Sequence, residues 1–270
     1  MCTMTAVTTK TLGRDKALVG MVHLGPLPGS PDGCPSVQAV IDQACEEANM
    51  LAAAGFDAIL IENMHDRPYM LRHAGPGAIA AMSAVGCAIR SDWSGPLGVQ
   101  LLAGDNTGAL AIAKACNATF IRAEGFVFAS VADEGLMAEA DAGPLLRARR
   151  TLDASDIAIF ADIKKKHSSH AITADIDLPD TARAAAFCRA DGVVITGSST
   201  GCPVDQLEVE AVRHAVDLPI LIGSGVTADT VEPLFRHANA LVVGSALKVD
   251  GLWSNAMDRS RVDAIVTSRG

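Results

Sequence analysis

Short apolar segments recur at fairly even spacing along the chain, and most of them are rich in β-branched residues. They are apolar along nearly their whole length instead of alternating with polar residues, which is typical of strands that are covered on both faces. The segments are LVGMVHL (18–24), AILIE (58–62), PLGVQLL (96–102), FIRA (120–123), IAIFADI (157–163), GVVIT (192–196), PILIG (219–223) and ALVVG (240–244). We therefore predict a strand at each of these eight segments.

Alanine-rich stretches with helical periodicity separate the predicted strands. In residues 36–55, apolar side chains recur every three to four positions from Val40 to Leu51, and Gly55 is a typical helix stop. Similar patterns predict further helices at about residues 76–91, 107–116, 143–152, 180–190, 205–215, 229–236 and 258–267. The repeated alternation of a buried strand with a helix indicates a parallel sheet closed into a (β/α)8 barrel, the TIM-barrel fold.

A doubly wound open sheet is the structural alternative. It would normally bring a glycine-rich dinucleotide fingerprint after the first strand. Residues 20–33, GMVHLGPLPGSPDG, lack that fingerprint, because their prolines would break the helix that it requires. We therefore predict an α/β fold with a single barrel over residues 18–270, preceded by a short, loose N-terminal arm over residues 1–17.

The composition narrows the classes of partner. The chain of 270 residues is 49% hydrophobic and carries a formal net charge of −9. Nucleic acids and anionic membrane surfaces are bound mainly through basic protein surface, so neither is an expected partner. An anionic ligand must then be held by a local site.

Cysteine usage and the absence of long apolar runs indicate a compartment. The seven cysteines are odd in number, widely scattered and form no C-x-x-C pair, so the sequence predicts neither a disulfide framework nor a zinc knuckle. The first sixteen residues lack the apolar core of a signal peptide, and no later apolar run approaches the roughly 18 residues of a spanning helix. We expect a cytoplasmic protein without membrane insertion.

Catalytic groups of such a barrel collect at the C-terminal ends of its strands. The fifth predicted strand ends in FADIKKKH, residues 160–167. Asp162 and Lys164, two positions apart in an extended chain, would project to the same side and form an acid–base or electrostatic pair, in which we take Lys164 as substrate-binding. Lys166 and His167 are further catalytic candidates there, whereas Lys165 is expected in solvent. The alternative is an ordinary surface ion pair, since consecutive lysines are usually solvated.

The second predicted strand ends in IENMHDRPY, residues 61–69. Glu62, Asn63 and Asp66 could hold a divalent metal through oxygen ligands, bind sugar hydroxyls or supply a general base. A buried capping network would produce the same pattern. We take Glu62 as catalytic and the other two as substrate-binding. A divalent metal is the one cofactor that this pattern leaves open, although the spacing is not that of a dedicated site.

Two further strand ends carry basic side chains. His23, after the first strand, could orient or protonate a substrate or serve as a structural hydrogen-bond partner. Arg122, after the fourth, could neutralise an anionic group of the substrate or pair with Glu124. The third strand leads to Asp105. The proline-rich residues 25–33 could fold over the mouth of the barrel as a partial lid.

Glycine-rich loops follow the seventh and eighth predicted strands, in GSGVTADT (223–230) and VGSALK (243–248). In barrels, these two loops often bind phosphate through backbone N–H groups, and glycine permits a close approach. The alternative is that the glycines only form tight turns. The predicted phosphate-binding residues are Gly223, Ser224, Gly225, Gly244 and Ser245.

Several of these motifs are long and unusual, above all the first. Together, GMVHLGPLPGSP, IENMHDRP, FIR, ADIKKKH, VVITGSSTG, ILIGSGVT and VGSALKVDG resemble the BtpA/SgcQ family, a branch of the phosphate-binding TIM barrels, from about residue 18 to residue 266. The resemblance marks most of the candidates above and adds Thr196, Thr200 and Lys248, of which we take the two threonines as substrate-binding. The family tends to have Arg-Asn near the end of the third strand, where this chain reads LLAGDNTGA, so its substrate preference is expected to differ.

The resemblance implies two functions. Family members carry a label as assembly or stability factors for photosystem I, and a sugar- or nucleoside-related enzymatic role has been suggested for members in bacteria that have no photosystem. The first hypothesis for this chain is an enzyme that acts on a small phosphorylated sugar or nucleotide-like compound, with isomerisation, aldol-type cleavage and glycosidic C–N cleavage all open.

The second hypothesis is a non-catalytic assembly protein that has kept the barrel and exposes an apolar patch. The enzyme is preferred, because a mouth lined with charged side chains lowers stability unless a ligand binds there. The alanine-rich outer helices could also support a homo-oligomer.

Overall fold

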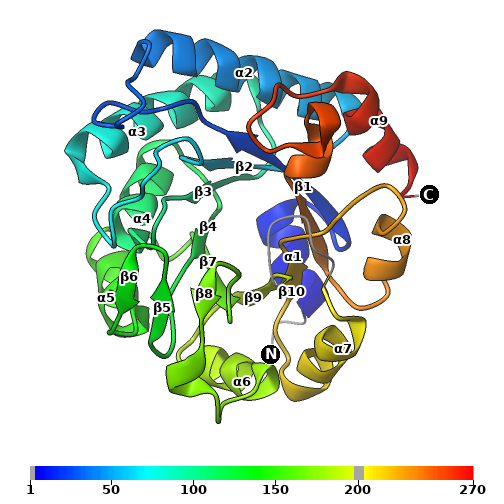
Figure 1. Cartoon of the computed structure of the whole chain (residues 1–270). Helices are drawn as coiled ribbons and strands as arrows, with labels where there is room; N and C mark the ends of the chain where they lie inside the picture. Colours follow the sequence, from blue (N-terminus) through cyan, green and yellow to red (C-terminus); the bar gives the residue numbers. More distant parts are fainter. Residues whose placement is uncertain (1–3, 198–203, 270) are drawn as a thin grey trace.

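Parallel strands close into a barrel in the computed structural model, which describes residues 4–197 and 204–269 (Figure 1). Around the barrel the strand order is β1–β2–β3–β4–β7–β9–β10–β11. The strands are β1 (Ala17–His23), β2 (Ala58–Glu62), β3 (Leu97–Gln100), β4 (Phe120–Ala123), β7 (Ala158–Ile163), β9 (Gly192–Ile195), β10 (Ile220–Ile222) and β11 (Ala240–Val243). Each lies within a predicted segment or one residue beyond it, so the predicted TIM barrel is confirmed.

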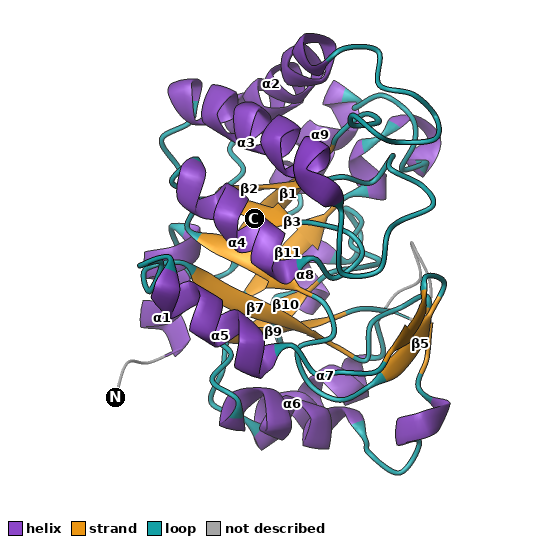
Figure 2. Cartoon of the chain, turned by 90° about the vertical axis from the view of Figure 1, so that its left-hand side faces the viewer, coloured by secondary structure: helices purple, strands orange, loops and turns teal. Residues whose placement is uncertain are grey.

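Helices surround the barrel and cover the outer face of its strands (Figures 1 and 2). They are α2 (Val37–Ala54), α3 (Gly75–Asp92), α4 (Asn106–Ala115), α5 (Ala142–Thr151), α6 (Leu178–Phe187), α7 (Gln206–Ala215), α8 (Val231–Leu234) and α9 (Arg259–Thr267). The Ser36 hydroxyl caps α2 by accepting from the N–H of Ala39, and Gly55, at φ 97°, ends it. The predicted helices are confirmed, although α8 is only four residues long.

The lower half of the barrel interior is a packed apolar core. The rings of Phe120 and Phe160 lie 5.5 Å apart inside it, and both side chains are buried. A Cβ atom at Gly98 would lie 2.2 Å from the Phe120 ring, and one at Gly192 would lie 2.6 Å from the Phe160 ring. Glycine at these two strand positions therefore makes room for the phenylalanines that fill the floor below the mouth.

Residues near the N-terminus form a helix and not the predicted loose arm. Helix α1 (Met4–Leu12) lies at the end of the barrel opposite the mouth (Figure 2). Leu12 is fully buried in the same core as the interior phenylalanines, and the carbonyl of Thr11 accepts from the Thr119 hydroxyl at 3.0 Å. The helix is held because it closes apolar surface at the N-terminal ends of the strands.

A small antiparallel sheet at the mouth was not predicted. It consists of β5 (Ser130–Ala132), β6 (Gly135–Met137) and β8 (Ser168–Ser169), in the order β6–β5–β8. Short 3₁₀ helices follow at η1 (Ala171–Thr173), η2 (Ser245–Leu247) and η3 (Val249–Gly251). Strands of two or three residues contain too little pattern to be read from sequence. Within residues 4–197 and 204–269, no helix is long and apolar enough to cross a membrane.

Candidate active site

A cavity of about 700 Å³ opens at the C-terminal ends of the barrel strands. Its lining comes from both sides of the barrel and from the small sheet. Of the predicted candidates, those that line it are His23, Glu62, Arg122, Asp162, Lys166, His167, Gly223, Ser224, Gly225, Gly244 and Ser245. The barrel thus gathers in one cavity residues that are far apart in the sequence.

Neighbouring strands carry polar side chains side by side on the floor of this cavity. The register pairs His23 on β1 with Glu62 on β2, and Glu62 with Gln100 on β3. Gln100 was missed in favour of Asp105, which instead caps α4 by accepting from the N–H of Gly108. A single polar residue within the apolar segment PLGVQLL was the signal that could have identified Gln100.

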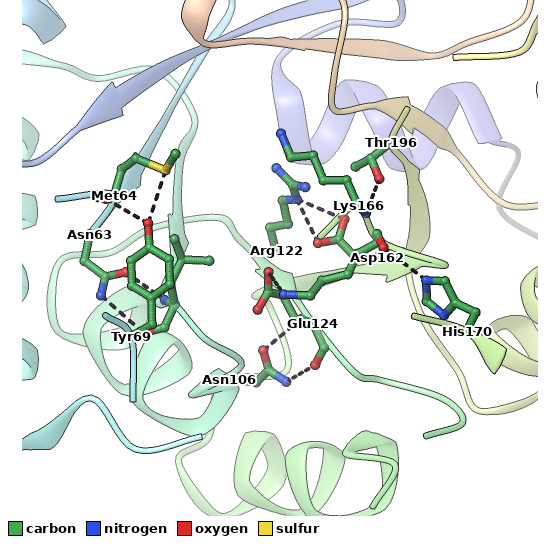
Figure 3. Close-up of polar contacts among 12 residues, drawn as sticks. Asn63, Met64, Tyr69, Asn106, Arg122, Glu124, Asp162, Lys166, His170 and Thr196 are labelled. Carbon is green, nitrogen blue, oxygen red and sulfur yellow. Dashed lines mark hydrogen bonds and ion pairs between the residues drawn. The ribbon is translucent and has the colours of Figure 1, made fainter. Parts of the chain in front are cut away.

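The centre of the floor is a buried ion pair between Arg122 and Asp162 (Figure 3). The Nε atom of Arg122 lies 3.0 and 3.2 Å from the two carboxylate oxygens of Asp162. Burial raises the pKa of Asp162, and Arg122 opposes this rise only in part. Burial would lower the pKa of Arg122, but Asp162 and Glu62 outweigh it and leave that pKa raised. The site therefore holds a guanidinium that stays charged.

The predicted pairing of Asp162 with Lys164 is wrong. Strand β7 ends at Ile163, and Lys164 adopts a left-handed backbone with φ 45°, so the extended geometry that would align the two side chains stops before it. Lys164 does not line the large cavity. It lies instead beside a separate small cavity of about 30 Å³.

Lys165 is not in solvent, as the sequence predicted, but forms a second ion pair inside the cavity. Its Nζ lies 3.0 Å from Oε1 of Glu124, and its side chain is 12% exposed. Burial would lower the pKa of Lys165, but the carboxylates of Glu124, Glu134 and Asp162 together outweigh it and raise that pKa. The other oxygen of Glu124 is buried and has no partner in the described part of the chain.

Lys166 is held by its backbone and leaves its amine unpaired. Its N–H donates to the hydroxyl of Thr196 at 2.9 Å (Figure 3). The amine has no hydrogen-bond or ion-pair partner among residues 4–197 and 204–269. Burial, followed by Arg122, lowers the pKa of Lys166. Thr196 thus fixes the loop and does not line the cavity, while predicted Thr200 lies outside the described residues.

His23 and Glu62 form an uncharged or singly charged pair. The Nδ1 atom of His23 lies 3.3 Å from the carbonyl of Trp253, which can only accept, so Nδ1 carries the proton and Nε2 presents its lone pair. Nε2 lies 3.7 Å from Oε2 of Glu62. Burial, with Lys248 next, lowers the pKa of His23 to about 3. Burial also raises the pKa of Glu62 to about 7, against Arg122 and Lys166.

A buried ion pair beside the mouth fixes the segment after β11. Nζ of Lys248 lies 2.6 Å from Oε1 of Glu47 on α2, and both side chains are almost fully buried. This pair ties η2 and η3 to the helix layer. It also places beside His23 a positive charge that disfavours the imidazolium form.

Asn63 and Asp66 hold loops and do not line the cavity, which corrects their predicted placement. The Asn63 amide accepts from the N–H of Leu102 at 2.7 Å and donates to its carbonyl at 3.2 Å. Asp66 accepts from the N–H of Leu27 at 2.7 Å. Their polar atoms are therefore engaged by neighbouring loops, as in the capping network left open above. The predicted lid, residues 25–33, does not line the cavity either.

The described ranges contain no group of three or more His, Cys, Asp or Glu side chains arranged to hold a metal ion. The carboxylates of Glu62 and Asp66 could have contributed to such a group, but their surroundings differ. Glu62 lines the cavity, whereas the Asp66 carboxylate accepts a hydrogen bond from the N–H of Leu27.

The two glycine-rich loops form one wall of the cavity. Within the described residues, the N–H groups of Gly225, Ser245 and Ala246 have no acceptor. A Cβ atom at Gly223 would lie 3.4 Å from the Arg122 guanidinium, and one at Gly244 would lie 3.3 Å from the His23 ring. These two glycines therefore also make room for the floor residues. Helix α8 is too short to add a helix-terminus field.

Part of the rim of the cavity is aromatic and was not predicted. Trp253 and Tyr69 line it together with Met64 and Leu102. The guanidinium carbon of Arg67 lies 4.8 Å from the centre of the Trp253 ring. The cavity thus combines an apolar rim, a charged floor and a wall with free backbone N–H groups in the described residues.

Comparison with known proteins identifies the family. Residues 14–269 match the BtpA family. The chain belongs to this family. Its relatives include the mitochondrial protein F13E9.13 of Caenorhabditis elegans, described as uncharacterized, which is 40% identical over 95% of this chain and 94% of the relative. The photosystem I biogenesis protein BtpA of Synechocystis is 35% identical over 95% of this chain and 89% of the relative.

Solved structures support the fold at low sequence identity. Thiamine phosphate pyrophosphorylase from Pyrococcus furiosus has a TM-score of 0.56 and 12% identity, and the match covers 94% of this chain and 95% of the pyrophosphorylase chain. Phosphoribosyl anthranilate isomerase from Thermus thermophilus has a TM-score of 0.55 and 11% identity, and the match covers 93% of this chain and 97% of the isomerase chain. At such identities the likeness extends to the barrel alone.

Proposed function

We propose that this BtpA-family barrel is an enzyme that acts by acid–base chemistry on a small phosphorylated sugar or nucleotide-like compound. The observation that carries the proposal is the pair formed by His23 and Glu62. The lone pair of a neutral imidazole lies 3.7 Å from a carboxyl group that burial leaves close to half-protonated at neutral pH. One group can donate a proton and the other can accept one under the same conditions.

The neighbouring charges suit a reaction in which negative charge develops on the substrate. The Arg122 guanidinium remains charged beside Asp162 and belongs to the same floor. In a site with little water, a fixed cation of this kind stabilises an oxyanion or enolate without having to reorganise. Asp162 keeps the guanidinium in place, because both oxygens of its carboxylate contact Nε.

The glycine-rich wall supports an anionic group on the substrate. Backbone N–H groups without an acceptor in the described chain, at Gly225, Ser245 and Ala246, form a surface that suits phosphate oxygens. The guanidinium of Arg261 on α9 also lines the cavity. Since the chain carries a net charge of −9, a local concentration of donors is the feature that would attract an anion.

Unpaired acceptors on the floor support a substrate that carries hydroxyl groups. Oε1 of Gln100 and Oε2 of Glu124 are buried, line the same cavity and have no partner among the described residues. A buried acceptor left without a donor destabilises the fold by about 1–3 kcal/mol. Sugar hydroxyls are donors that would satisfy both atoms.

The test is turnover by a Glu62→Gln variant on the compounds that stabilise the wild-type protein. We expect the variant to bind them and to lose turnover by about 10²–10⁴-fold, the usual contribution of general acid–base catalysis. Glu232→Gln, at an exposed position of α8, is the matched control and should keep wild-type turnover. Wild-type turnover by Glu62→Gln would overturn the proposed role of the pair.

A second candidate, a non-catalytic assembly protein, is favoured by a different surface. Val131 and Leu136 are paired across β5 and β6 and are 41% and 55% exposed, and Ile172 on η1 is also exposed. A Synechocystis relative is named for photosystem I biogenesis. If the chain is an assembly protein, replacing these three residues with serine will abolish its assembly function, whereas Glu62→Gln will leave that function unchanged.

A further inference from the structure

We infer that Lys166 is a nucleophile that forms an imine with the carbonyl carbon of a phosphorylated aldehyde or ketone. The inference rests on the proposed function, because it places a phosphorylated substrate in the same cavity. It goes further by naming the bond that forms and the functional group that the substrate must carry.

Two of the cations in the cavity are held by ion pairs. Arg122 is held by Asp162 at 3.0 Å, and Lys165 is held by Glu124 at 3.0 Å. The amine of Lys166 lies in the same cavity lining and, within the described residues, has neither a hydrogen bond nor an ion pair. In Figure 3, the dashed line to Thr196 marks its backbone N–H, and none reaches the amine.

The surroundings of Lys166 shift its amine towards the neutral form. Burial and the nearby Arg122 guanidinium lower the pKa of Lys166, although Glu62, Asp162 and Glu124 act in the opposite direction. Its neighbour Lys165 has a raised pKa because of Glu124. Two consecutive lysines in one cavity thus differ: Lys165 remains an ammonium, while Lys166 yields a neutral amine more readily. A neutral amine is the nucleophilic form.

The backbone of Lys166 is fixed by a hydrogen bond. Its N–H donates to the hydroxyl of Thr196, the residue that follows β9, at 2.9 Å. This bond ties the loop after β7 to the end of the adjacent strand. A nucleophile on an anchored backbone loses less freedom when the substrate binds than one on an unattached loop.

The cavity provides the groups that imine formation needs. The amine nitrogen attacks the carbonyl carbon and a C–N bond forms. The nitrogen gives up two protons, and the carbonyl oxygen receives two and leaves as water. His23 and Glu62, which line the same cavity, are the groups that relay these protons. The iminium form then accepts the electron pair of a breaking C–C or C–H bond, and water later restores the carbonyl and the amine. No oxidant or reductant is required.

The arrangement of the strands supports a phosphate on the same substrate. Strands β10 and β11, whose loops carry the N–H groups of Gly225 and Ser245, follow β9 in the barrel. A phosphate on this wall and a carbonyl group at Lys166, which follows β7, would lie in one mouth with β9 between their strands. The substrate class is therefore a short phosphorylated aldehyde or ketone.

The experiment is site-resolved reductive alkylation of the wild-type protein at neutral pH. Formaldehyde with cyanoborohydride traps imines of the smallest carbonyl compound, and peptide mass spectrometry gives a rate for each of the seven lysines. We expect Lys166 to react at least about tenfold faster than Lys165 and the exposed Lys10 and Lys16. Glyceraldehyde 3-phosphate with cyanoborohydride should then label Lys166 selectively, and excess inorganic phosphate should block this labelling.

Two variants serve as controls. Lys10→Arg, at an exposed position outside the cavity, should leave the labelling of Lys166 unchanged, while Lys166→Arg should abolish the selective adduct. Circular dichroism of both variants checks that they fold.

Labelling of Lys166 no faster than that of the exposed lysines would overturn the inference. If phosphorylated sugars still stabilised the chain in that case, and Glu62→Gln still lost turnover, the proposed acid–base function would stand without the imine. A reactive Lys166 in a chain that no phosphorylated compound stabilises or labels would also overturn the inference, because its substrate class would be wrong.

Discussion

Replacing Glu62 with glutamine should change how the stability of the chain depends on pH. Burial raises the pKa of Glu62 from its ordinary 4.5 to about 7. Between pH 4.5 and about pH 7, Glu62 is therefore protonated in the folded chain and ionised in the unfolded chain. The contribution of this group to the free energy of unfolding is therefore complete below about pH 4.5 and is lost as the pH rises through about 7. Glutamine does not titrate and removes this dependence.

The magnitude follows from the two pKa values. Each factor of ten in proton affinity corresponds to about 1.4 kcal/mol. The rise from 4.5 to about 7 thus predicts that wild type loses about 3 kcal/mol relative to Glu62→Gln as the pH increases across that range. His23, whose pKa falls from 6.5 to about 3, acts in the opposite direction: its contribution is present above 6.5 and is lost as the pH falls towards 3. It is common to both proteins and largely cancels in the difference.

Urea denaturation of both proteins from about pH 4 to about pH 8.5 measures this difference. We expect the free energy of unfolding of Glu62→Gln, relative to wild type, to rise by about 3 kcal/mol over the range, with unchanged m values. Glu232→Gln, at an exposed position, should follow the wild-type curve. A difference between Glu62→Gln and wild type that stays constant with pH would refute the raised pKa and with it the acid–base role.

Three further outcomes are expected. Asp162→Asn leaves the Arg122 guanidinium buried without its counter-charge and should reduce the free energy of unfolding by about 3–5 kcal/mol, whereas Asp180→Asn, in an exposed pair, should change it by no more than about 1 kcal/mol in urea denaturation. Lys248→Met leaves the buried Glu47 carboxylate on α2 unpaired and should also reduce the free energy of unfolding by about 3–5 kcal/mol. A reduction under about 1 kcal/mol would contradict this expectation. Ser245→Asp places a negative charge on the glycine-rich wall, so it should abolish stabilisation by phosphorylated compounds while leaving the fold intact by circular dichroism.

The barrel and the location of its mouth could be predicted because they depend on strong, local patterns. Strands such as AILIE and ALVVG are apolar along nearly their whole length, and parallel strands separated by helices bring their C-terminal ends to one side. For this reason His23, Glu62, Arg122 and Asp162 could be placed at one cavity from sequence alone.

The partners of these side chains could not be predicted. Asp162 contacts Arg122, forty positions away in sequence, because β4 and β7 are adjacent in the barrel, whereas the nearby Lys164 turns away after the strand ends. Asn63 and Asp66 share a motif with Glu62 but engage backbone groups of loops that only the fold brings close. A spacing of a few residues does not determine which side of a loop a side chain faces.

Elements with little sequence pattern were missed for a similar reason. Strands β5, β6 and β8 are two or three residues long, and α1 is recognisable chiefly by the burial of Leu12 against the barrel core. The aromatic rim depends on Trp253, which follows the last strand in an irregular segment and reaches the mouth through the turns of η2 and η3.

The central claim, that the mouth binds a small phosphorylated substrate, is tested most directly by the stability of the purified wild-type chain with matched sugars, nucleosides and their phosphates. A ligand at about 100 times its dissociation constant should raise the free energy of unfolding by about 2.7 kcal/mol. We expect phosphorylated members of the panel to stabilise the chain and their unphosphorylated counterparts not to, and we expect the stabilisation to be lost in Ser245→Asp. Equal stabilisation by both forms, or by neither, would contradict it.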